Sequence, residues 1–460
     1  MHTVEIFLEN RGFIVAKILI RDGCVLSLDS KVGNFHKASV LIDGDRIAAV
    51  GPNVTAADAE IIDAAGMIVM PGFVDTHRHT WEGILRNIGT NVPLEGDESY
   101  LSLILNTLAP AYRPEDVYVG NLVSLLGAIN AGITTLLDWS HIQATPDHTS
   151  EGLRALKDSG MRIVFGYGHP WWGSPIAAHD DEFRRLARDE FASKDQLLTL
   201  ALASMGPEFM PFDAVRAQWE LARSVDARIS VHVGVGTYGR HGKLQAMGEA
   251  GLLGPDTTYI HCTTLNDTEI KMIVDTGGTI SISAPVEMMM GHGMVPTQKF
   301  LDRGLRPSLS VDVETNVPGE MFTQMRTILS LQRALVFERV LSGEGGAPDF
   351  LNARDALEFA TIQGARALGL DSRIGTLTPG KQADIILLNG NRVNVMPVND
   401  PIGAVVWGMD TSNVDSVFVA GRPLKRGGKL VGHDMAQIQR MVYQSRDYVV
   451  STAGYRVPQL

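Results

Sequence analysis

His77 and His79, in the segment PGFVDTHRH, are the residues whose types and spacing most directly suggest a chemistry. In an extended chain, side chains at positions i and i+2 point to the same side, so two imidazoles at this spacing can bind one metal ion. The pair alone is a weak signal, because the chain has 13 histidines and two of them on a surface loop would give the same pattern. The apolar run 67–74 before the pair supports the metal-binding interpretation, because it predicts a buried strand.

Three further polar residues lie at the ends of short apolar segments. His232 is in ISVHV, His261 in TYIHC and Asp312 in LSVDV. A single histidine at such a place is more often a buried or loop residue without a chemical role. Three such places beside a histidine pair are harder to explain in this way, because each must fall on the same face of the fold. Imidazole and carboxylate donors suit a divalent ion, for which Zn2+ is the default and Fe2+, Mn2+ or Ni2+ are also compatible.

The middle of the chain, residues 70–370, alternates short apolar segments with amphipathic ones. Besides the strand before His77, we expect strands at 133–138, 162–166, 197–203, 229–233, 258–262, 279–283 and 308–312. Between them, residues 116–131 repeat leucine and isoleucine with the helical period of about 3.6 residues. Eight strands that alternate with helices over ~300 residues are typical of a (β/α)8 TIM barrel, whose active sites lie at the carboxyl ends of the strands. An open, doubly wound α/β sheet is the alternative.

Both ends of the chain are rich in β-forming residues. The N-terminal segments AKILIRDGCVLSL and KASVLIDGDRIAAVG contain Asp22-Gly23 and Asp43-Gly44, turn dipeptides typical of hairpins. Residues 382–388 and 414–419, near the C-terminus, are also short segments typical of strands. We therefore predict an α/β fold in which a barrel (70–370) carries a small β-sandwich built from residues 1–69 and 371–460, the latter with a C-terminal tail.

The composition favours a globular protein that acts on a small molecule. Hydrophobic residues make up 45% and charged residues 20%, and no run approaches the ~20 apolar residues of a membrane span. A net charge of −12 disfavours nucleic acids and anionic membranes, which select basic surfaces. Cys24 and Cys262 are far apart, which excludes a disulfide framework and a cysteine-rich metal cluster. The N-terminal segment lacks the pattern of a secretory signal, so we expect a cytoplasmic protein.

Five segments together resemble the amidohydrolase superfamily, and within it the cytosine deaminase and triazine hydrolase type. They are PGFVDTHRH, VHVG, YIHC, SLSVDVETN and GTLTPGKQADIILL, which span nearly the whole chain. The resemblance implies a single divalent metal ion bound by four residues, namely His77, His79, His232 and Asp312. It places His261 over the substrate or the water instead of on the metal. The predicted fourth strand, LLTLALASM, has no lysine, so the carboxylated lysine of the family's binuclear members is not expected.

Such a site suits hydrolysis. An ion with three neutral imidazoles and one carboxylate keeps a positive charge and lowers the pKa of a bound water towards neutrality. Asp312 can then accept the water's proton, while His261 can donate to or polarise the group under attack.

One position departs from the pattern of this type. Its deaminases carry a glutamate three residues after the histidine of the fifth strand, where it moves protons to the leaving group; here that position is Val235. Candidates for its role are Glu208, Glu287, Glu314, His241 and His292. Hydrolysis of a carbon–nitrogen bond in a small cyclic or aromatic molecule is the leading hypothesis. A lyase, isomerase or decarboxylase reaction with the same metal, and a barrel that binds without catalysing, are the alternatives.

Loops after the predicted strands carry side chains that suit a flat or apolar substrate. Candidates for contact with it are Trp81, His141, His169, Trp172, Glu208, Glu287, Met288, Met289, Met290 and His292. The long segment 80–114 is a candidate lid over the pocket. We expect Arg78 to be held by nearby carboxylates, and the protein to be a homo-oligomer, as barrels of this kind often are.

Overall fold

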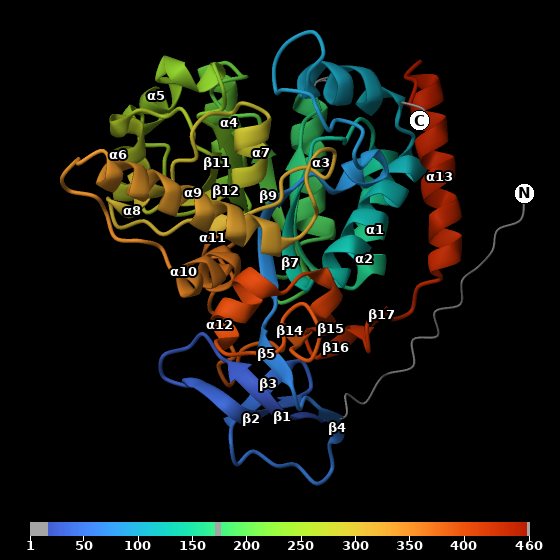
Figure 1. The fold of residues 1–460 in the computed structure, drawn as a ribbon. Coiled ribbons are helices and arrows are strands. Elements are labelled where there is room, and N and C mark those ends of the chain that lie inside the picture. Colours follow the sequence, from blue (N-terminus) through green and yellow to red (C-terminus); the bar gives the residue numbers. More distant parts are fainter. Residues whose placement is uncertain (1–16, 171–175, 458–460) are drawn as a thin grey trace, which may run out of the picture.

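The computed structural model describes residues 17–170 and 176–457. It contains an eight-stranded parallel sheet from the middle of the chain and a nine-stranded sheet from its two ends. Figure 1 shows the second sheet below the barrel, with blue N-terminal strands beside orange and red C-terminal ones. Among the described residues, no helix has the length and apolar character needed to cross a membrane.

The parallel strands of the barrel follow one another in chain order. They are β6 (Phe73–Arg78), β7 (Ile133–Ser140), β8 (Arg162–Gly168), β9 (Leu198–Ser204), β10 (Arg228–Val233), β11 (Thr257–His261), β12 (Thr279–Ile282) and β13 (Ser308–Leu309). The barrel closes between its first and last strands, where the N–H of Asp312 donates to the carbonyl of His77 and the N–H of His79 donates to the carbonyl of Asp312, both at 2.9 Å. The predicted TIM barrel is confirmed, and the open sheet is excluded because its two edges join.

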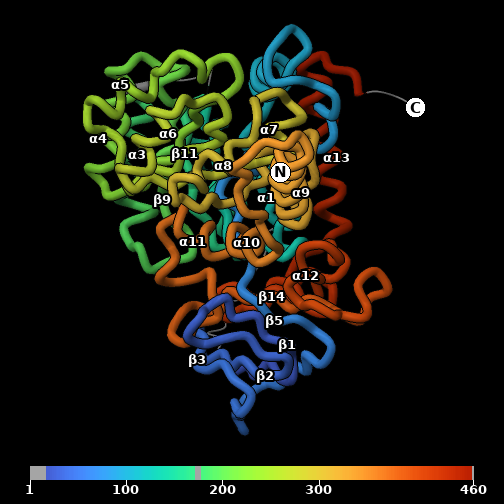
Figure 2. Tube along the Cα trace, turned by 60° about the vertical axis from the view of Figure 1, so that its left-hand side comes forward, coloured from blue at the N-terminus to red at the C-terminus, as the bar shows by residue number. Residues whose placement is uncertain are grey.

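Helices surround this barrel, as the tube view shows (Figure 2). They are α1 (Pro114–Asn130), α2 (Pro146–Ser159), α3 (Ile176–Asp189), α4 (Phe212–Ser224), α5 (Lys243–Glu249), α6 (Asp267–Asp275), α7 (Ala284–Met289), α8 (Thr297–Leu301), α9 (Met321–Leu341), α10 (Ala353–Glu358) and α11 (Gly364–Ala367). The helix predicted at 116–131 is α1, which begins with a proline in its first turn and ends before Gly132. Gly132 has a φ of +85°, a conformation that stops a helix and favours glycine.

The sheet from the two chain ends forms a separate β domain. Its strands are β1 (Ile18–Leu26), β2 (Asn34–Asp43), β3 (Arg46–Gly51), β4 (Glu60–Asp63), β5 (Met67–Pro71), β14 (Ile385–Asn389), β15 (Val414–Val419), β16 (Arg422–Arg426) and β17 (Lys429–Leu430). The two ends meet where β5 pairs antiparallel with β14. A buried core that includes Val40, Ile385 and Phe418 lies within this domain. The prediction of a β domain built from both ends is confirmed.

Two local predictions need correction. Asp43-Gly44 does form the β2–β3 hairpin, but Asp22-Gly23 does not form a turn, because β1 continues through it with a bulge at which Asp22 has a φ of +65°. The apolar run 67–74 is two strands in two sheets, β5 and β6, divided at Gly72. Any larger residue at Gly72 would collide with the Thr134 side chain, so glycine permits the close passage from one sheet to the other.

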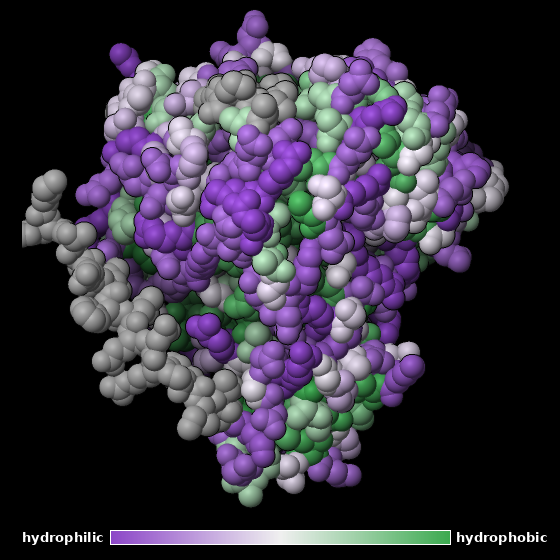
Figure 3. Space-filling model, turned by 180° about the vertical axis from the view of Figure 1, so that it is seen from behind, coloured by the Kyte–Doolittle hydropathy of each residue, from purple (hydrophilic) through white to green (hydrophobic). Residues whose placement is uncertain are grey.

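The surface and the C-terminal segment complete the fold. Seen from behind, hydrophilic residues cover most of the molecule and hydrophobic ones show only in patches (Figure 3). The last helix, α13 (Met435–Thr452), lies along the barrel beside α1 (Figure 1). There the guanidinium of Arg113 lies 3.6 Å from the ring centre of Tyr448, a cation–π contact. The C-terminal tail thus returns to the barrel.

Candidate metal centre

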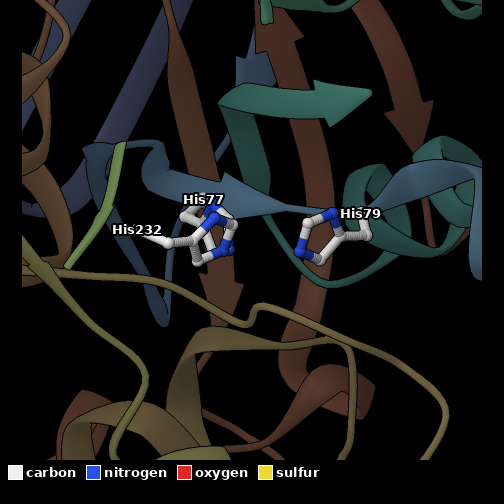
Figure 4. Close-up of side chains that lie close together, drawn as sticks. All are labelled: His77, His79 and His232. Atoms are coloured by element: carbon white, nitrogen blue, oxygen red, sulfur yellow. The ribbon is translucent and has the colours of Figure 1, made fainter. Parts of the chain in front are cut away.

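Four side chains meet at the carboxyl end of the barrel. His77 lies on β6 next to its last residue and His79 directly follows the strand, while His232 lies on β10 and Asp312 follows β13. The Nε2 atom of His77 lies 3.1 Å from Oδ1 of Asp312 and 3.2 Å from Nε2 of His232. The Nε2 atom of His79 lies 3.4 Å from the same Asp312 oxygen. Figure 4 shows the three imidazoles close together, with His77 and His79 on one segment of the chain and His232 on another.

These donor atoms fit a divalent ion. In a tetrahedral zinc site with bonds of about 2.0–2.1 Å, neighbouring ligand atoms are about 3.3 Å apart. The measured separations of 3.1, 3.2 and 3.4 Å agree with that spacing. Three imidazoles and one carboxylate also provide the nitrogen and oxygen donors that zinc and its first-row neighbours accept.

Hydrogen bonds orient the donors before any ion arrives. Nδ1 of His79 lies 2.8 Å from the carbonyl oxygen of Trp139, which can only accept, so this nitrogen carries the proton and Nε2 keeps its lone pair. The backbone of Asp312 is fixed by its two bonds to β6 and has a φ of +70°, and His261 has a φ of +69°. Non-glycine residues in this left-handed region are uncommon and concentrate at functional sites.

The charges of these side chains are suited to metal binding. Burial lowers the pKa of His77 to about 3, so its imidazole is neutral at pH 7 and can act as a ligand. Burial opposes ionisation of Asp312, but hydrogen bonds with His77 and His79 hold the pKa of that carboxyl well below its usual range. Burial also lowers the pKa of His232, whereas at His79 the effect of burial is outweighed by the hydrogen bond with Asp312 and the charge of Glu82, and the pKa is raised. His77 and His232 are therefore neutral beside the Asp312 carboxylate.

His261 lies beside these four side chains, at the end of β11. Its Nε2 atom is 3.7 Å from Oδ2 of Asp312, and its Nδ1 atom is 3.2 Å from Oε1 of Glu287. The same Glu287 oxygen accepts the N–H of Ser283 at 2.8 Å. Burial raises the pKa of Glu287 well above its usual range and lowers that of His261 to about 4. Glu287 thus lies behind His261 and fixes its ring.

A pocket opens above the cluster. Its walls are mainly apolar or aromatic, with the polar groups gathered at the cluster. The lining residues are His79, Leu94, Tyr100, Leu101, Leu105, Trp139, His141, Met205, Phe209, His232, Val235, His261, Met290, His292, Asp312 and Val313. Of the residues expected at the substrate, His141, Met290 and His292 line this pocket.

Other expected contacts lie elsewhere. Trp81 is fully buried and its ring centre is 5.5 Å from that of His141, behind the pocket wall. The ring of His169 lies 4.5 Å from that of His179, outside the lining, and Trp172 lies outside the described residues. Met288 and Met289 are exposed.

Glu208 supports the loop that follows His232. Its carboxylate accepts the backbone N–H groups of Gly234 and Val235, the latter at 3.3 Å. Burial raises the pKa of Glu208 to about 7. Both oxygens of its carboxylate are therefore hydrogen-bonded to the backbone.

Two other candidates for the missing glutamate's role are also placed away from the pocket. Glu314 pairs with Arg86 at 2.9 Å and with Arg78 at 3.7 Å. His241 is exposed and does not line the pocket. Arg78 also donates from Nε to Asp75 at 2.8 Å, which confirms that nearby carboxylates hold it.

Several residues of the segment expected to be a lid, among them Leu94, Tyr100 and Leu105, line the pocket. Residues 80–113 form short 3-10 turns and a π-helix (Leu101–Leu108) between β6 and α1. The N–H of Leu94 donates to the carbonyl of Met290 at 2.8 Å, and Glu95 accepts from the hydroxyl of Thr237 at 2.7 Å. The segment therefore bridges the loops after β10 and β12.

Sequence reasoning did not identify several residues of this region. Trp139 lines the pocket and its carbonyl orients His79; its place at the end of β7 was a usable signal. Glu82 is fully buried and accepts the hydroxyl of Tyr100 at 2.6 Å, while burial raises its pKa to about 8. Both Glu82 and Tyr100 lie on the lid, whose irregular sequence carries no periodic signal for their burial.

Comparisons with known proteins agree with this architecture. The sequence pattern described as the amidohydrolase family matches residues 68–424. The 5'-deoxyadenosine deaminase of Methanothermobacter thermautotrophicus is 30% identical over 410 residues, which are 86% of this chain and 91% of that protein. The 5-methylthioadenosine/S-adenosylhomocysteine deaminase of Pyrococcus abyssi is 26% identical over 441 residues, 92% of this chain and 96% of that one.

Solved structures share the fold at lower identity. An adenosine deaminase from Xanthomonas campestris with bound zinc superposes with a TM-score of 0.83 at 22% identity, covering 94% of this chain and 98% of that one. Atrazine chlorohydrolase from Arthrobacter aurescens TC1, complexed with zinc, superposes with a TM-score of 0.82 at 22% identity, covering 94% and 100%. The likeness therefore includes both the barrel and the β domain.

Proposed function

The chain belongs to the amidohydrolase family, and from this premise we propose that it hydrolyses a carbon–nitrogen bond of a small cyclic or aromatic molecule with the help of one divalent metal ion. The observation that carries the proposal is the meeting of three histidines and one aspartate beside an apolar pocket, where the donor atoms of His77 lie 3.1 and 3.2 Å from those of Asp312 and His232, and that of His79 lies 3.4 Å from Asp312. We assign the metal to His77, His79, His232 and Asp312.

Zinc is the ion we favour, because structural neighbours contain it and the donor spacing suits it. When bound, the ion would supply a water of lowered pKa and a positive charge opposite the developing negative charge. Asp312 is ionised and can accept a proton from that water. His261, fixed by Glu287, presents Nε2 to the same space and can hydrogen-bond the group under attack.

The pocket limits the substrate to a small molecule with an apolar body. Aliphatic and aromatic side chains, among them Leu105, Phe209 and Met290, form most of the wall. Such walls stabilise a flat ring by burial and contribute few directional bonds. The curated relatives named above deaminate adenosine derivatives, and an aminated heterocycle is therefore the first substrate class to test.

The other hypotheses lose support. A lyase or isomerase reaction was favoured only by Val235, and the curated relatives are hydrolytic deaminases. A barrel without catalysis would have no need to keep four donors at ligand spacing. Homo-oligomerisation and a cytoplasmic location remain predictions; light scattering of the purified protein measures the first.

Metal analysis and an amine-release assay test the proposed function. We expect protein purified without added ions to contain about one equivalent of a divalent metal, and a panel of aminated and halogenated heterocycles to include a substrate that releases ammonia or amine. Chelation should abolish the activity and zinc should restore it. Less than about a tenth of an equivalent of metal, with no turnover after zinc is supplied, contradicts the proposal.

Restoring the family's glutamate at Val235 is not expected to increase deamination. Val235 is buried, 4% exposed, and its N–H already faces the carboxylate of Glu208. A second buried carboxyl beside Glu208 is penalised by desolvation and like charge, so V235E should melt at a lower temperature and release no more amine than the native protein. V235Q, which has the same shape without the charge, is the matched control. A large gain in amine release by V235E alone would show that only the glutamate was missing.

A further inference from the structure

One buried histidine of the pocket has no hydrogen-bond partner. His292 follows α7 and is only 3% exposed, and neither of its ring nitrogens is hydrogen-bonded to any residue that the structure describes. A buried polar group without a partner is costly, so native structures rarely keep one without a use. Because His292 lines the pocket, a molecule bound there can supply the missing hydrogen bond.

The backbone places His292 beside the position of the missing glutamate. Its carbonyl accepts the N–H of Gly236 at 2.8 Å and the hydroxyl of Thr263 at 2.6 Å. Gly236 directly follows Val235, and both Val235 and His292 line the pocket. The ring of His292 lies 4.6 Å from that of His261, edge to face at 85°. His292 therefore lies beside both the loop that carries Val235 and the ring of His261.

The other acidic or basic candidates are engaged or distant. Glu208 binds backbone N–H groups, Glu287 binds His261, and Glu314 pairs with Arg86. His241 is exposed and outside the pocket lining. His292 alone among these candidates both lines the pocket and has free ring nitrogens within the described structure.

We propose that His292 transfers the proton to the leaving group, the task that the family's glutamate performs from the position of Val235. The inference rests on the proposed hydrolysis. In that reaction the oxygen of water forms a bond to carbon, the carbon–nitrogen bond breaks, and one proton of the water ends on the leaving nitrogen. Asp312 first accepts the proton of the water. The imidazole of His292 then takes up that proton at one ring nitrogen while its other nitrogen donates to the leaving nitrogen, so that Asp312 is again ionised and the ring begins and ends neutral.

The electrostatic surroundings agree with a neutral ring. Burial lowers the pKa of His292 to about 3, with the neighbouring His261 acting in the same direction. A neutral imidazole has one donor and one acceptor, which this relay requires. A carboxylate at Val235 would place a negative charge at the same wall, whereas His292 leaves it uncharged.

Two matched variants and a spectrum test the inference. In zinc-loaded enzyme acting on a substrate found in the amine-release panel, H292Q should lower kcat by about 100-fold with little change in KM, zinc content or melting temperature. H241Q, at an exposed histidine, should behave as the native enzyme. Free imidazole should restore part of the activity of H292A. Binding of the product amine should shift the ring-nitrogen NMR signals of His292 in the native protein, a readout independent of turnover.

The outcomes separate this inference from the proposed function. If the native enzyme releases amine but H292Q keeps its kcat within about threefold, the His292 assignment is wrong and the hydrolase proposal stands. If H292A is slow but is not rescued and has lost zinc or thermal stability, the residue is structural and the assignment fails. If the native protein hydrolyses no compound of the panel, both the proposed hydrolase function and the assignment of His292 are wrong.

Discussion

Replacing Asp312 with asparagine is expected to reduce turnover by about 1000-fold or more, the largest effect on activity that the site predicts. Oδ1 of Asp312 lies within 3.4 Å of both His77 and His79, and its pKa is held well below the usual range by hydrogen bonds that oppose the effect of burial. Asparagine keeps the shape and one oxygen donor but can neither carry the negative charge nor accept a proton. Steady-state kinetics with metal analysis of the same samples measures both losses.

Asp302 supplies the matched control for this experiment. It is an exposed aspartate at the end of α8, where it accepts a hydrogen bond from the side chain of Gln298 at 2.7 Å. D302N should retain the native kcat and zinc content. If D312N also kept native turnover with one equivalent of zinc, the assignment of Asp312 as ligand and proton acceptor would be wrong.

Replacing Asp384 with alanine is expected to lower the free energy of unfolding by about 3–5 kcal/mol, the largest effect on stability. Asp384 lies just before β14, in the segment GTLTPGKQADIILL, and binds the guanidinium of Arg162 on β8 through two hydrogen bonds of 2.8 and 3.0 Å. Both side chains are only 2% exposed. The carboxylate also accepts the N–H of Ala420 at 2.8 Å. Its removal leaves a buried, unpaired guanidinium between the barrel and the β domain.

Denaturant unfolding and two further variants test this role. The pair Lys17–Asp58 has side chains that are 37% and 70% exposed, and D58A should leave the unfolding midpoint unchanged because surface ion pairs contribute little. The double variant R162M/D384L removes both charges and should recover most of the stability that D384A loses. An unchanged midpoint in D384A would mean that this ion pair does not join the two domains energetically.

The stability role of Asp384 explains one part of the family resemblance in physical terms. The segment that contains it has no residue in the pocket lining, although it is one of the five segments that resemble the family. The segment instead lies at the junction between the two sheets, where β14 pairs with β5 and Asp384 binds Arg162. A sequence pattern can thus identify a family without separating residues that stabilise the fold from residues that act on a substrate.

The sequence alone predicted the architecture of the fold, a barrel with a β domain built from both ends of the chain. Alternating apolar and amphipathic segments predicted the eight barrel strands, because parallel strands buried on both faces need continuous apolar residues. The boundary errors have local causes. The run 67–74 looked like one strand because β5 and β6 are both buried, and only their hydrogen-bond partners show that they belong to different sheets. Asp22-Gly23 looked like a turn because a bulge uses the same residue types as a hairpin.

The sequence also determined which side chains could bind a metal, since strand ends on one face of a barrel follow from the order of the elements. Only the tertiary structure decided how they are used. Barrel closure brings Asp312 to His77, and residues of the lid line the pocket. Glu208, Glu287 and Glu314 are paired with the backbone after His232, with His261 and with Arg86. It leaves His292 unpaired at the wall beside Val235. Side-chain periodicity is a local property of the chain, whereas the partner of a buried polar group depends on segments distant in sequence.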